Sequence, residues 1–417
     1  MTEISISRIK QQIDALRQIG LDQTGGTTRL SYSPEYIKGQ ALVRGYMEEA
    51  GMTVRLDGAG NLIGTYAGTE TQLAPVMTGS HLDTVPGGGS LDGALGIIAA
   101  IECIASWNRA LWRPQRTVEV VAMIEEEGTR FGVTCFGSRA MMGEFSGSAG
   151  KEIADSRGQT LGDLLAGMGL GREIQINAED DPRRLHAFVE LHVEQGAELE
   201  EADLSVGIVT AIVGIERFEV TIRGQANHAG TTGMYRRKDA LVAAADLIRF
   251  VHDSARSAGG EYVATVGKLE VRPNAENVVP GEVRLTVEIR AADKAIIEQV
   301  RKGVLQFFAD YEMQSGIRME TGRFNEVMPT QLHEGLVNCC TEAAEKLGLP
   351  YRKMPSWAGH DAMILAKLVP ATMIFVPSID GISHSPAEAS DWEAVAKGVQ
   401  VLQLVLEKIS GADSLTR

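Results

Sequence analysis

The sequence predicts an α/β fold made of two domains, with the second inserted into the first. At 417 residues the chain is too long for one compact core. Strand-like and helix-like runs alternate over the first half of the chain, which is typical of a sheet covered by helices. The order of elements then changes to β-α-β-β-α-β, and the alternation of strands and helices seen in the first half resumes after it. We therefore expect a mixed-sheet domain of residues 1–212 and 329–417, interrupted by a ferredoxin-like α+β domain of residues 213–328.

The elements of the first domain follow in order from the amino terminus. Residues 1–20 have the spacing of an amphipathic helix, and a polar loop then leads into a second helix. Residues 52–68 predict a hairpin. Three apolar strands with polar carboxyl ends follow, and a helix from Ala94 to about Trp107 separates the first two. These strands begin near Ala74, Thr117 and Ala187.

The inserted domain has a denser alternation of elements. Its first strand alternates apolar and polar residues, and the helix after it places one apolar face inward. Two more strands, a second helix and a last strand complete the module. The strands cover residues 217–225, 261–271, 281–293 and 316–324, and the helices cover 236–259 and 294–311. The first domain then resumes with a helix at 332–347, a strand at 371–376 and a closing helix after Trp392.

Composition and charge narrow the class of protein. The chain is 44% hydrophobic and 23% charged, as ordinary soluble proteins are. Its net charge of −15 argues against nucleic acid or an anionic membrane as a partner. Its four cysteines, Cys103, Cys135, Cys339 and Cys340, lack a CxxC spacing, so we expect reduced thiols in a cytoplasmic protein. The amino terminus has no signal-peptide core, and no apolar run approaches the roughly 20 residues that span a bilayer.

Candidate metal ligands occupy the ends of the predicted strands. His81 and Asp83 follow an apolar run at alternate positions, so on a strand they would point to the same side. A loop rich in glycine then leads to Asp92, just before a helix. Glu127 closes a strongly apolar strand, and His192 lies at the end of another. His384 follows a further apolar strand, which makes five candidate ligands: His81, Asp92, Glu127, His192 and His384.

Three imidazoles and two carboxylates form a ligand set that zinc and related divalent ions prefer. Each residue by itself has an ordinary explanation, because a histidine after a strand is commonly a hydrogen-bonded cap and a run of acidic residues is commonly a solvated strand end. Their recurrence at successive strand ends favours a shared site, since such sites gather at the strand ends of α/β sheets. Two metal ions about 3.5–4 Å apart would need one bridging carboxylate.

Seven ordered segments make the chain resemble a known family. They are GSHLDTVPGGGSLDG, EEEGTRF, ELHVEQG, NHAGTTGM, RPNAENVVPG, AGHDA and GISHSPAE. The chain resembles the hydantoinase/carbamoylase-type amidases, which belong to the superfamily of two-metal aminoacylases and carboxypeptidases, and the resemblance covers nearly its whole length. It implies hydrolysis of a ureido or amide C–N bond with two Zn or Mn ions per subunit, or Co in their place. It also implies that the inserted domain acts as a lid and forms a homodimer.

The resemblance assigns a role to each residue of the expected metal centre. Asp92 would bridge the two ions. His81 and His192 would complete the coordination of one ion, and Glu127 and His384 would complete that of the other. Glu126 falls at the position of the general base, and Asp83 would be a carboxylate that orients His81.

Substrate contacts are implied in the same way. His228 would donate to the oxyanion in the partner subunit's site, although Gly233 stands where the family usually has proline, which loosens this loop. Asn277 and Arg290 match the contacts to the substrate carboxylate. Arg217 stands where the allantoate-hydrolysing members carry arginine and many carbamoyl-amino-acid hydrolases carry an aromatic residue. The remaining lining residues are Gln195, Gly359 and His360.

Several functions compete at this point. Arg217 favours allantoate, and an N-carbamoyl-L-amino acid hydrolase with the same metals is the alternative. A peptidase or aminoacylase of the wider superfamily is disfavoured by the AGHDA, RPN and HAGTT segments. A binding protein that had lost catalysis would lack a ligand or the base, and none is missing. A serine or cysteine nucleophile, such as Ser80, has no nucleophile elbow around it.

Overall fold

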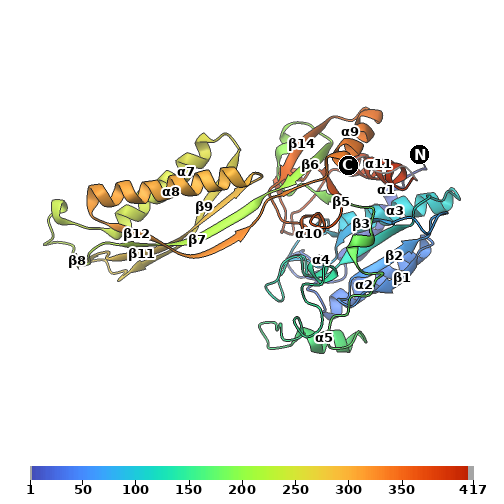
Figure 1. Ribbon diagram of the computed structural model, residues 1–417, viewed down its shortest axis with the longest axis horizontal. Coiled ribbons are helices and arrows are strands. Elements are labelled where there is room, and N and C mark those ends of the chain that lie inside the picture. The colour runs from blue at the N-terminus through green and yellow to red at the C-terminus, as the bar shows by residue number, and fades with distance from the viewer. Residues whose placement is uncertain (1, 412–417) are drawn as a thin grey trace. The chain divides into compact units, whose positions relative to one another are not determined.

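The structure, a computed structural model, describes residues 2–411, and the chain divides into two compact units. Unit 2 is Ala211–Gln331, and unit 1 consists of the residues before and after it. The sequence analysis placed these divisions at 213 and 328. Figure 1 shows that each unit has its own sheet and its own helices. The predicted fold class, an α/β protein with a mixed sheet, is confirmed.

The larger sheet has nine strands among the described residues, in the order β1-β2-β4-β3-β5-β15-β6-β13, with β14 paired to β6. All of it belongs to unit 1 except β13 and the last two residues of β6, which fall within Ala211–Gln331. Its centre is parallel, because β3 pairs in parallel with β4 and β5, and β15 pairs in parallel with β5. Its margins are antiparallel. The strands are β1 (Thr53–Leu56), β2 (Leu62–Tyr66), β3 (Val76–His81), β4 (Val118–Met123), β5 (Ala187–Val193), β6 (Val206–Ile212), β13 (Thr330–Gln331), β14 (Tyr351–Ser356) and β15 (Ala371–Val376).

Every residue of the four central strands is buried, since helices cover both faces of a parallel sheet. Helices α3 and α11 pack against β5, and α2 packs against β1 and β2 (Figure 1). The helices of unit 1 are α1 (Ile6–Arg17), α2 (Pro34–Glu49), α3 (Ala94–Arg109), α4 (Phe136–Met141), α5 (Leu161–Gly167), α6 (Glu198–Glu201), α9 (Glu334–Lys346), α10 (Asp361–Leu365) and α11 (Trp392–Ile409).

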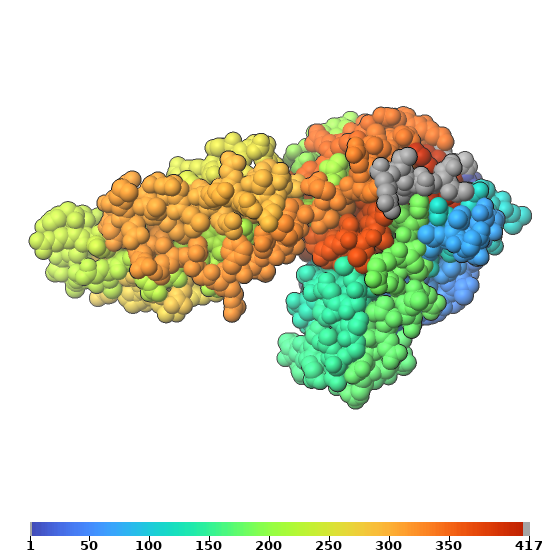
Figure 2. Space-filling model, viewed as in Figure 1, coloured from blue at the N-terminus to red at the C-terminus, as the bar shows by residue number. Residues whose placement is uncertain are grey.

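The chain between β4 and β5 is mostly loop, and it carries α4, α5 and the 3-10 helix η1 (Pro182–Arg184). Figure 2 shows its teal and green atoms gathered in one region of unit 1. The sequence analysis predicted none of these short elements, nor strands β6, β13 and β14. The strands that it did predict through the centre of the sheet are the ones whose carboxyl ends meet at a single edge.

Unit 2 is a four-stranded antiparallel sheet of order β12-β7-β11-β9, and helices α7 and α8 pack against it. Alternate residues of β7 are buried, including Phe218, Val220 and Ile222, and they form a core with the apolar faces of the two helices. The elements are β7 (Gly214–Arg223), β8 (Asn227–His228), η2 (Met234–Arg236), α7 (Ala240–Ser257), β9 (Tyr262–Arg272), β10 (Val278–Val279), β11 (Glu282–Ala291), α8 (Lys294–Ser315) and β12 (Arg318–Val327). Among the described residues, no helix has the length and apolar character that crossing a membrane requires.

The strand that carries His81 leaves no room for a side chain at Gly79. Gly79 has a φ of +143°, and a Cβ atom there would lie 2.0 Å from the carbonyl oxygen of Val121 on β4. We predict that Gly79→Ala lowers the free energy of unfolding by about 1–3 kcal/mol or more, because the two central strands would have to move apart. Thermal or urea denaturation measures this change. Gly45→Ala is the control, since that helical position is open and alanine should stabilise it by about 0.5–1 kcal/mol. Equal stability of the two variants would contradict the prediction.

Candidate metal centre

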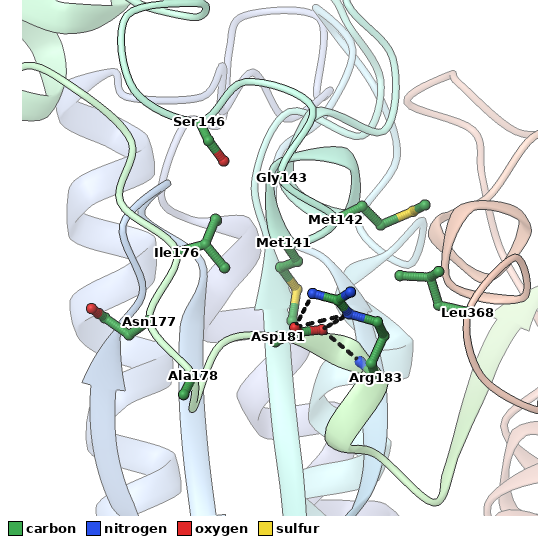
Figure 3. Close-up of a pocket in the computed structure, with 10 residues that line it drawn as sticks. All are labelled: Met141, Met142, Gly143, Ser146, Ile176, Asn177, Ala178, Asp181, Arg183 and Leu368. Atoms are coloured by element: carbon green, nitrogen blue, oxygen red, sulfur yellow. Dashed lines mark hydrogen bonds and ion pairs between the residues drawn. The ribbon is translucent and has the colours of Figure 1, made fainter.

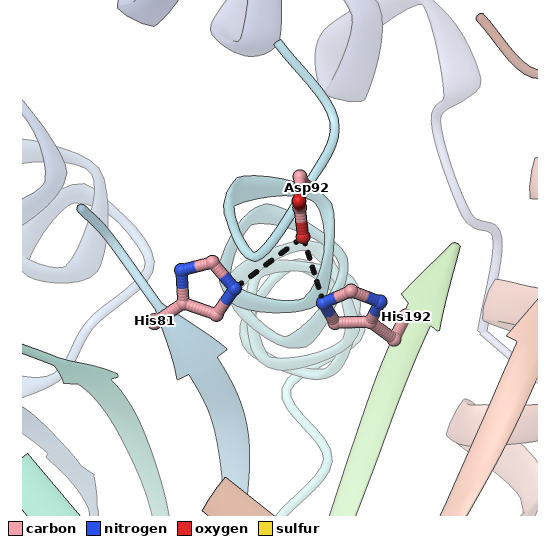
Figure 4. Close-up of side chains that lie close together, drawn as sticks. All are labelled: His81, Asp92 and His192. Atoms are coloured by element: carbon pink, nitrogen blue, oxygen red, sulfur yellow. Dashed lines mark ion pairs between the residues drawn. The ribbon is translucent and has the colours of Figure 1, made fainter. Parts of the chain in front are cut away.

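Two imidazoles converge on one carboxylate at the carboxyl edge of the central strands. His81 ends β3, His192 lies near the end of β5, and Asp92 comes from the loop before α3 (Figure 4). The Nε2 atoms of His81 and His192 lie 3.4 and 3.1 Å from Oδ1 of Asp92. All three side chains are buried. A group of two imidazoles and one carboxylate oxygen within this distance can hold a metal ion.

A second group uses the other oxygen of the same carboxylate. The Nε2 atom of His384 lies 3.1 Å from Oδ2 of Asp92 and 3.3 Å from Oε1 of Glu127. Asp92 therefore takes part in both groups, with one oxygen in each. The structure thus brings together all five ligands that the sequence predicted, and Asp92 lies where a bridging carboxylate would be needed.

The far sides of two imidazole rings are fixed by the main chain. Nδ1 of His81 lies 3.0 Å from the carbonyl oxygen of Asp83, and Nδ1 of His192 lies 2.8 Å from that of Val193. Because a carbonyl oxygen only accepts, each Nδ1 carries the hydrogen, and in the neutral ring Nε2 keeps a lone pair directed at Asp92. This is the tautomer in which a histidine binds a metal through Nε2.

Several atoms at this point are buried without a hydrogen-bond partner: Oδ1 of Asp92, Oε1 of Glu127 and Nε2 of His192. A buried polar atom without a hydrogen-bond partner costs free energy of folding, so the occurrence of such atoms in both ligand groups needs an explanation. Their chemistry, carboxylate oxygen and imidazole nitrogen, fits one or two divalent cations. The residues of the site therefore fit the metal ions that the sequence motifs imply.

The pKa shifts at the centre show that its buried carboxylates are stabilised by positive charge close to them. Burial raises the pKa of Asp92, but the adjacent imidazoles of His192, His384 and His81 outweigh it and hold this pKa well below its usual value. Burial lowers the pKa of His81, but Asp92 and Glu126 raise it well above normal. Burial raises the pKa of Glu127 to about 7. Protons therefore supply the positive charge when no cation is bound.

Glu126 is a buried carboxylate beside the two groups. Its Oε2 lies 4.0 Å from Nε2 of His81, and its Oε1 accepts a hydrogen bond from the Cys135 thiol at 3.4 Å. Burial raises its pKa well above normal, with the Asp361 and Glu127 carboxylates adding to the shift that His81 opposes. A carboxylate with a raised pKa, within reach of the centre but in neither ligand group, is suited to accept and return a proton.

Asp83 differs from the expectation. We expected a strand through Asp83 with its carboxylate orienting His81, but β3 ends at His81 and the main-chain carbonyl of Asp83 faces the ring. The Asp83 carboxylate lies 4.0 Å from Nδ1 of His81 and instead accepts the N–H groups of Glu126 and Glu127, at 3.1 and 3.2 Å. These two hydrogen bonds fix the turn that presents the two glutamates.

Backbone strain also marks this edge. Glu125, Gln195 and His384 have φ values of 56°, 61° and 53°, in the left-handed region that residues other than glycine rarely adopt. Each lies in or next to the centre. Such conformations cost about 1–3 kcal/mol each and persist only where the surroundings enforce them, which is common at functional sites.

Two predicted lining residues of unit 1 contact the centre. Gln195 donates from Nε2 to Oδ2 of Asp92 at 3.2 Å. The His360 ring, which follows Gly359, lies 4.6 Å from the His192 ring, and its Nε2 lies 2.9 Å from the Ser356 hydroxyl. Burial and the nearby His192 hold the pKa of His360 well below normal, so this ring is neutral.

The four predicted substrate residues of unit 2 fall into two pairs. His228 lies on β8, which pairs with β10, and the N–H of Ala229 donates to the carbonyl of Asn277 at 2.9 Å. Arg217 and Arg290 lie toward the opposite ends of β7 and β11 from this pair, and both bind the carboxylate of Glu288. The sequence analysis missed Glu288, whose neighbours only the strand pairing reveals.

A cavity of about 380 Å³ elsewhere in unit 1 contains no predicted site residue (Figure 3). It is lined by Met141, Ile176 and Leu368 among others, and its charged residues, Asp181 and Arg183, bind one another. The cavity therefore offers no unpaired charge and no ligand group. The sheet edge, and not this cavity, has the properties of a reactive site.

Comparisons with known proteins agree with this geometry. Residues 77–408 match the family described as Peptidase family M20/M25/M40. The chain is 41% identical over 406 residues to the allantoate amidohydrolase of Escherichia coli (strain K12), covering 96% of this chain and 97% of that protein. It is 40% identical over 395 residues to the N-carbamoyl-L-amino acid amidohydrolase of Geobacillus stearothermophilus, covering 95% and 96%. It superposes on a hydantoinase/carbamoylase family amidase from Burkholderia multivorans with a TM-score of 0.90 and 35% identity, covering 98% of each chain.

Metal affinity should depend on pH. The metal-free centre holds protons near neutrality, because the pKa values of His81 and His384 are raised and that of Glu127 is about 7. A cation must displace these protons, so the affinity falls as the pH falls below about 7 and rises above it. We expect the Kd for Mn²⁺ to increase about tenfold per pH unit for each proton displaced. Calorimetry in two buffers of different ionisation enthalpy counts the released protons. A Kd that does not change between pH 6 and 8 would contradict this assignment.

Proposed function

We propose a function for this chain, which belongs to peptidase family M20/M25/M40, a family of metal-dependent hydrolases. The resemblance to the hydantoinase/carbamoylase-type amidases is confirmed. On this premise the chain hydrolyses a ureido C–N bond in a small carboxylate, with allantoate as the best candidate. The observation that carries the proposal is the carboxylate of Asp92, shared between two ligand groups beside the buried Glu126.

Each ligand group would hold one divalent cation, Zn²⁺ or Mn²⁺, with Co²⁺ as a further candidate. His81 and His192 would hold one ion, Glu127 and His384 the other, and Asp92 would contact both. A bound cation supplies Lewis acidity, which polarises a carbonyl oxygen and makes water a stronger acid. The main-chain carbonyls behind His81 and His192 keep these rings in the orientation that the ions require.

Glu126 moves the proton in this proposal. It takes a proton from the attacking water as the new C–O bond forms at the ureido carbon, and it delivers that proton to the nitrogen as the C–N bond breaks. The products are an amine and carbamate, which decomposes to ammonia and CO₂. Burial of Glu126 favours both steps, because a carboxylate with a raised pKa is a stronger base and takes up a proton more readily.

Arg217 and Arg290 would bind the substrate's carboxylate and its uncleaved ureido arm, with Asn277 as a further contact. Both arginines bind Glu288, so their guanidinium groups lie close together on β7 and β11. The paired donors of a guanidinium group suit a substrate carboxylate. Gln195, Gly359 and His360 would line the reacting end of the substrate, next to Asp92 and His192.

The alternative substrate is an N-carbamoyl-L-amino acid. One similar protein is named for allantoate and another for carbamoyl amino acids, at nearly equal identity, so overall similarity does not separate the two. The alternative is favoured by the pairing of Arg217 with Glu288, which leaves this guanidinium partly occupied. Allantoate is favoured by the presence of an arginine at this position, since its second ureido arm needs hydrogen-bond donors.

We also propose a homodimer formed through unit 2. His228 on β8 is exposed, and the 3-10 helix η2 that follows exposes Met234 and Tyr235 by 76% and 87%. Such apolar exposure is typical of a contact surface. Strand β9 is an edge of the sheet and can pair with the same strand of a second copy across a two-fold axis. His228 would then act in the partner subunit's site.

Glu126→Gln tests the proton transfer. We expect turnover to fall by about 10²–10⁴-fold while metal content stays at the unaltered level, because the amide cannot accept the proton and Glu126 is not a ligand. Metal analysis and release of ammonia from allantoate measure the two effects. Glu127→Gln is the matched control and should lose metal. If the Glu126→Gln variant instead lost an ion, the roles of the two glutamates would be exchanged.

Mixing two inactive variants tests the shared site. His228→Ala combined with Glu126→Gln should recover up to roughly a quarter of full activity, because half of the reassorted dimers are mixed and each has one intact site. The control uses His252→Ala in place of His228→Ala. His252 is an exposed histidine on α7, so this variant should be fully active by itself. Mass spectrometry of mixed dimers verifies that subunits exchange. Exchange without recovery would place His228 in its own subunit's site or outside catalysis.

Arg217→Trp separates the two substrates. Removing the guanidinium should lower kcat/KM for allantoate by about 10–100-fold, the effect of a charged hydrogen bond. Large apolar N-carbamoyl amino acids should lose less, because the indole offers them an apolar surface. Arg223→Trp, on the same strand and paired with Glu282, is the matched control and should change neither substrate. Equal losses on both substrates would mean that Arg217 is structural.

A further inference from the structure

We infer that Glu388 is a positioning residue that holds two metal ligands in place, an inference that rests on the proposed function. Glu388 is only 8% exposed, and its carboxylate lies between the loop that carries Asp92 and the loop that carries His384. It belongs to neither ligand group. The mechanism proposed above does not use it.

One oxygen of Glu388 fixes the loop before α3. Its Oε1 accepts the N–H groups of Leu91 and Asp92, at 2.8 and 3.0 Å. These two amides belong to adjacent peptide units, so a single acceptor sets the orientation of the main chain on the approach to the Asp92 Cα atom. The direction of the Asp92 side chain follows from that orientation. The carboxylate also lies near the amino end of a helix, where negative charge is favourable.

The other oxygen fixes the loop of His384. Its Oε2 accepts the hydroxyl of Ser383 at 2.8 Å, and the N–H of Glu388 itself donates to the carbonyl of Ser385 at 3.0 Å. His384, between these two serines, has a strained φ of 53°. The contacts on either side keep the residue in this conformation. One side chain thus sets the distance between two ligands that are far apart in the sequence.

The glycine-rich loop leaves room for this carboxylate. A Cβ atom at Gly89 would lie 2.0 Å from Oε1 of Glu388 and 2.5 Å from its Cβ. A side chain at 89 would therefore push Glu388 away from the amides that it accepts. Three donors bind its two oxygens, so the carboxylate already has hydrogen-bond partners, and moving to a metal ion would break these bonds. Its function is to fix the ligands that do bind the metal.

The test measures metal binding as well as activity. The full chain is stripped of metal, and the Kd values for Zn²⁺ and Mn²⁺ are determined by competition with a chromophoric chelator for the unaltered protein, Glu388→Ala and Glu388→Gln. Glu102→Ala is the matched control, because Glu102 is a buried carboxylate on α3 that binds Arg8 and Arg109 away from the centre. The melting temperature without metal and the absorption spectrum of the Co²⁺ form are recorded for each.

Glu388→Ala should raise the Kd by about 10–100-fold, the usual effect of losing a group that orients metal ligands, and should shift the Co²⁺ bands. Glu388→Gln should restore most of the affinity, since its carbonyl oxygen still accepts both amides. Glu102→Ala should lower the melting temperature without changing the Kd. Ser383→Ala would remove the Oε2 contact but also this hydroxyl's 3.5 Å contacts with Oδ2 of Asp92 and Nε2 of Gln195. Glu388→Asp, whose shorter side chain withdraws the carboxylate from the amides, therefore serves if Glu388→Ala does not fold, and it should raise the Kd by a smaller factor.

Unchanged affinity in Glu388→Ala, or an equal loss in Glu102→Ala, would overturn the inference and leave the proposed function intact. No metal binding by the unaltered chain would overturn both. Weakened metal binding in Glu388→Ala together with no hydrolysis of ureido substrates by the unaltered protein would support the positioning role and overturn only the substrate assignment.

Discussion

The carboxylate of Asp92 is buried among three imidazoles, and the rest of unit 1 depends on keeping it there. Each of its oxygens faces nitrogen atoms within 3.4 Å. A buried carboxylate is costly unless positive charge lies close to it, and imidazoles with raised pKa values supply that charge when no cation does. Two divalent cations would supply it more fully, which is why this geometry favours a hydrolase with a metal centre over a binding protein.

The sheet makes this arrangement possible. Parallel central strands place their carboxyl ends at one edge, so polar residues that are remote in the sequence meet there. The ligands lie at the strand ends or in the loops that follow, and Glu190, a buried carboxylate within β5, accepts a hydrogen bond from Ser80 at 2.6 Å. Glu125, Gln195 and His384 have strained conformations in these loops, and partly buried hydrogen bonds hold Glu125 and Gln195.

Unit 2 combines a conventional core with a charged sheet surface. Its helices cover one face, and the strands place Arg217, Glu288 and Arg290 side by side on β7 and β11. A carboxylate shared by two arginines orders both guanidinium groups. If these arginines bind the substrate as proposed, that order would reduce the entropy lost on binding, and a substrate carboxylate would compete with Glu288.

The sequence by itself determined the fold class, and it predicted the five candidate ligands and the adjacent candidate base, because these depend on local patterns: apolar runs followed by His81, Glu127 or His192, and motifs with fixed internal spacing. It did not determine how Asp83 acts, since whether β3 continues past His81 depends on the loop packed against it. Cys135, Glu288 and Glu388 could not be found from spacing either. Their partners lie in segments distant along the chain, and only the tertiary structure buries Glu388 against the amides of Leu91 and Asp92 or places Glu288 between two arginines. Long-range pairing of this kind depends on strand order and loop packing, which local sequence patterns do not encode.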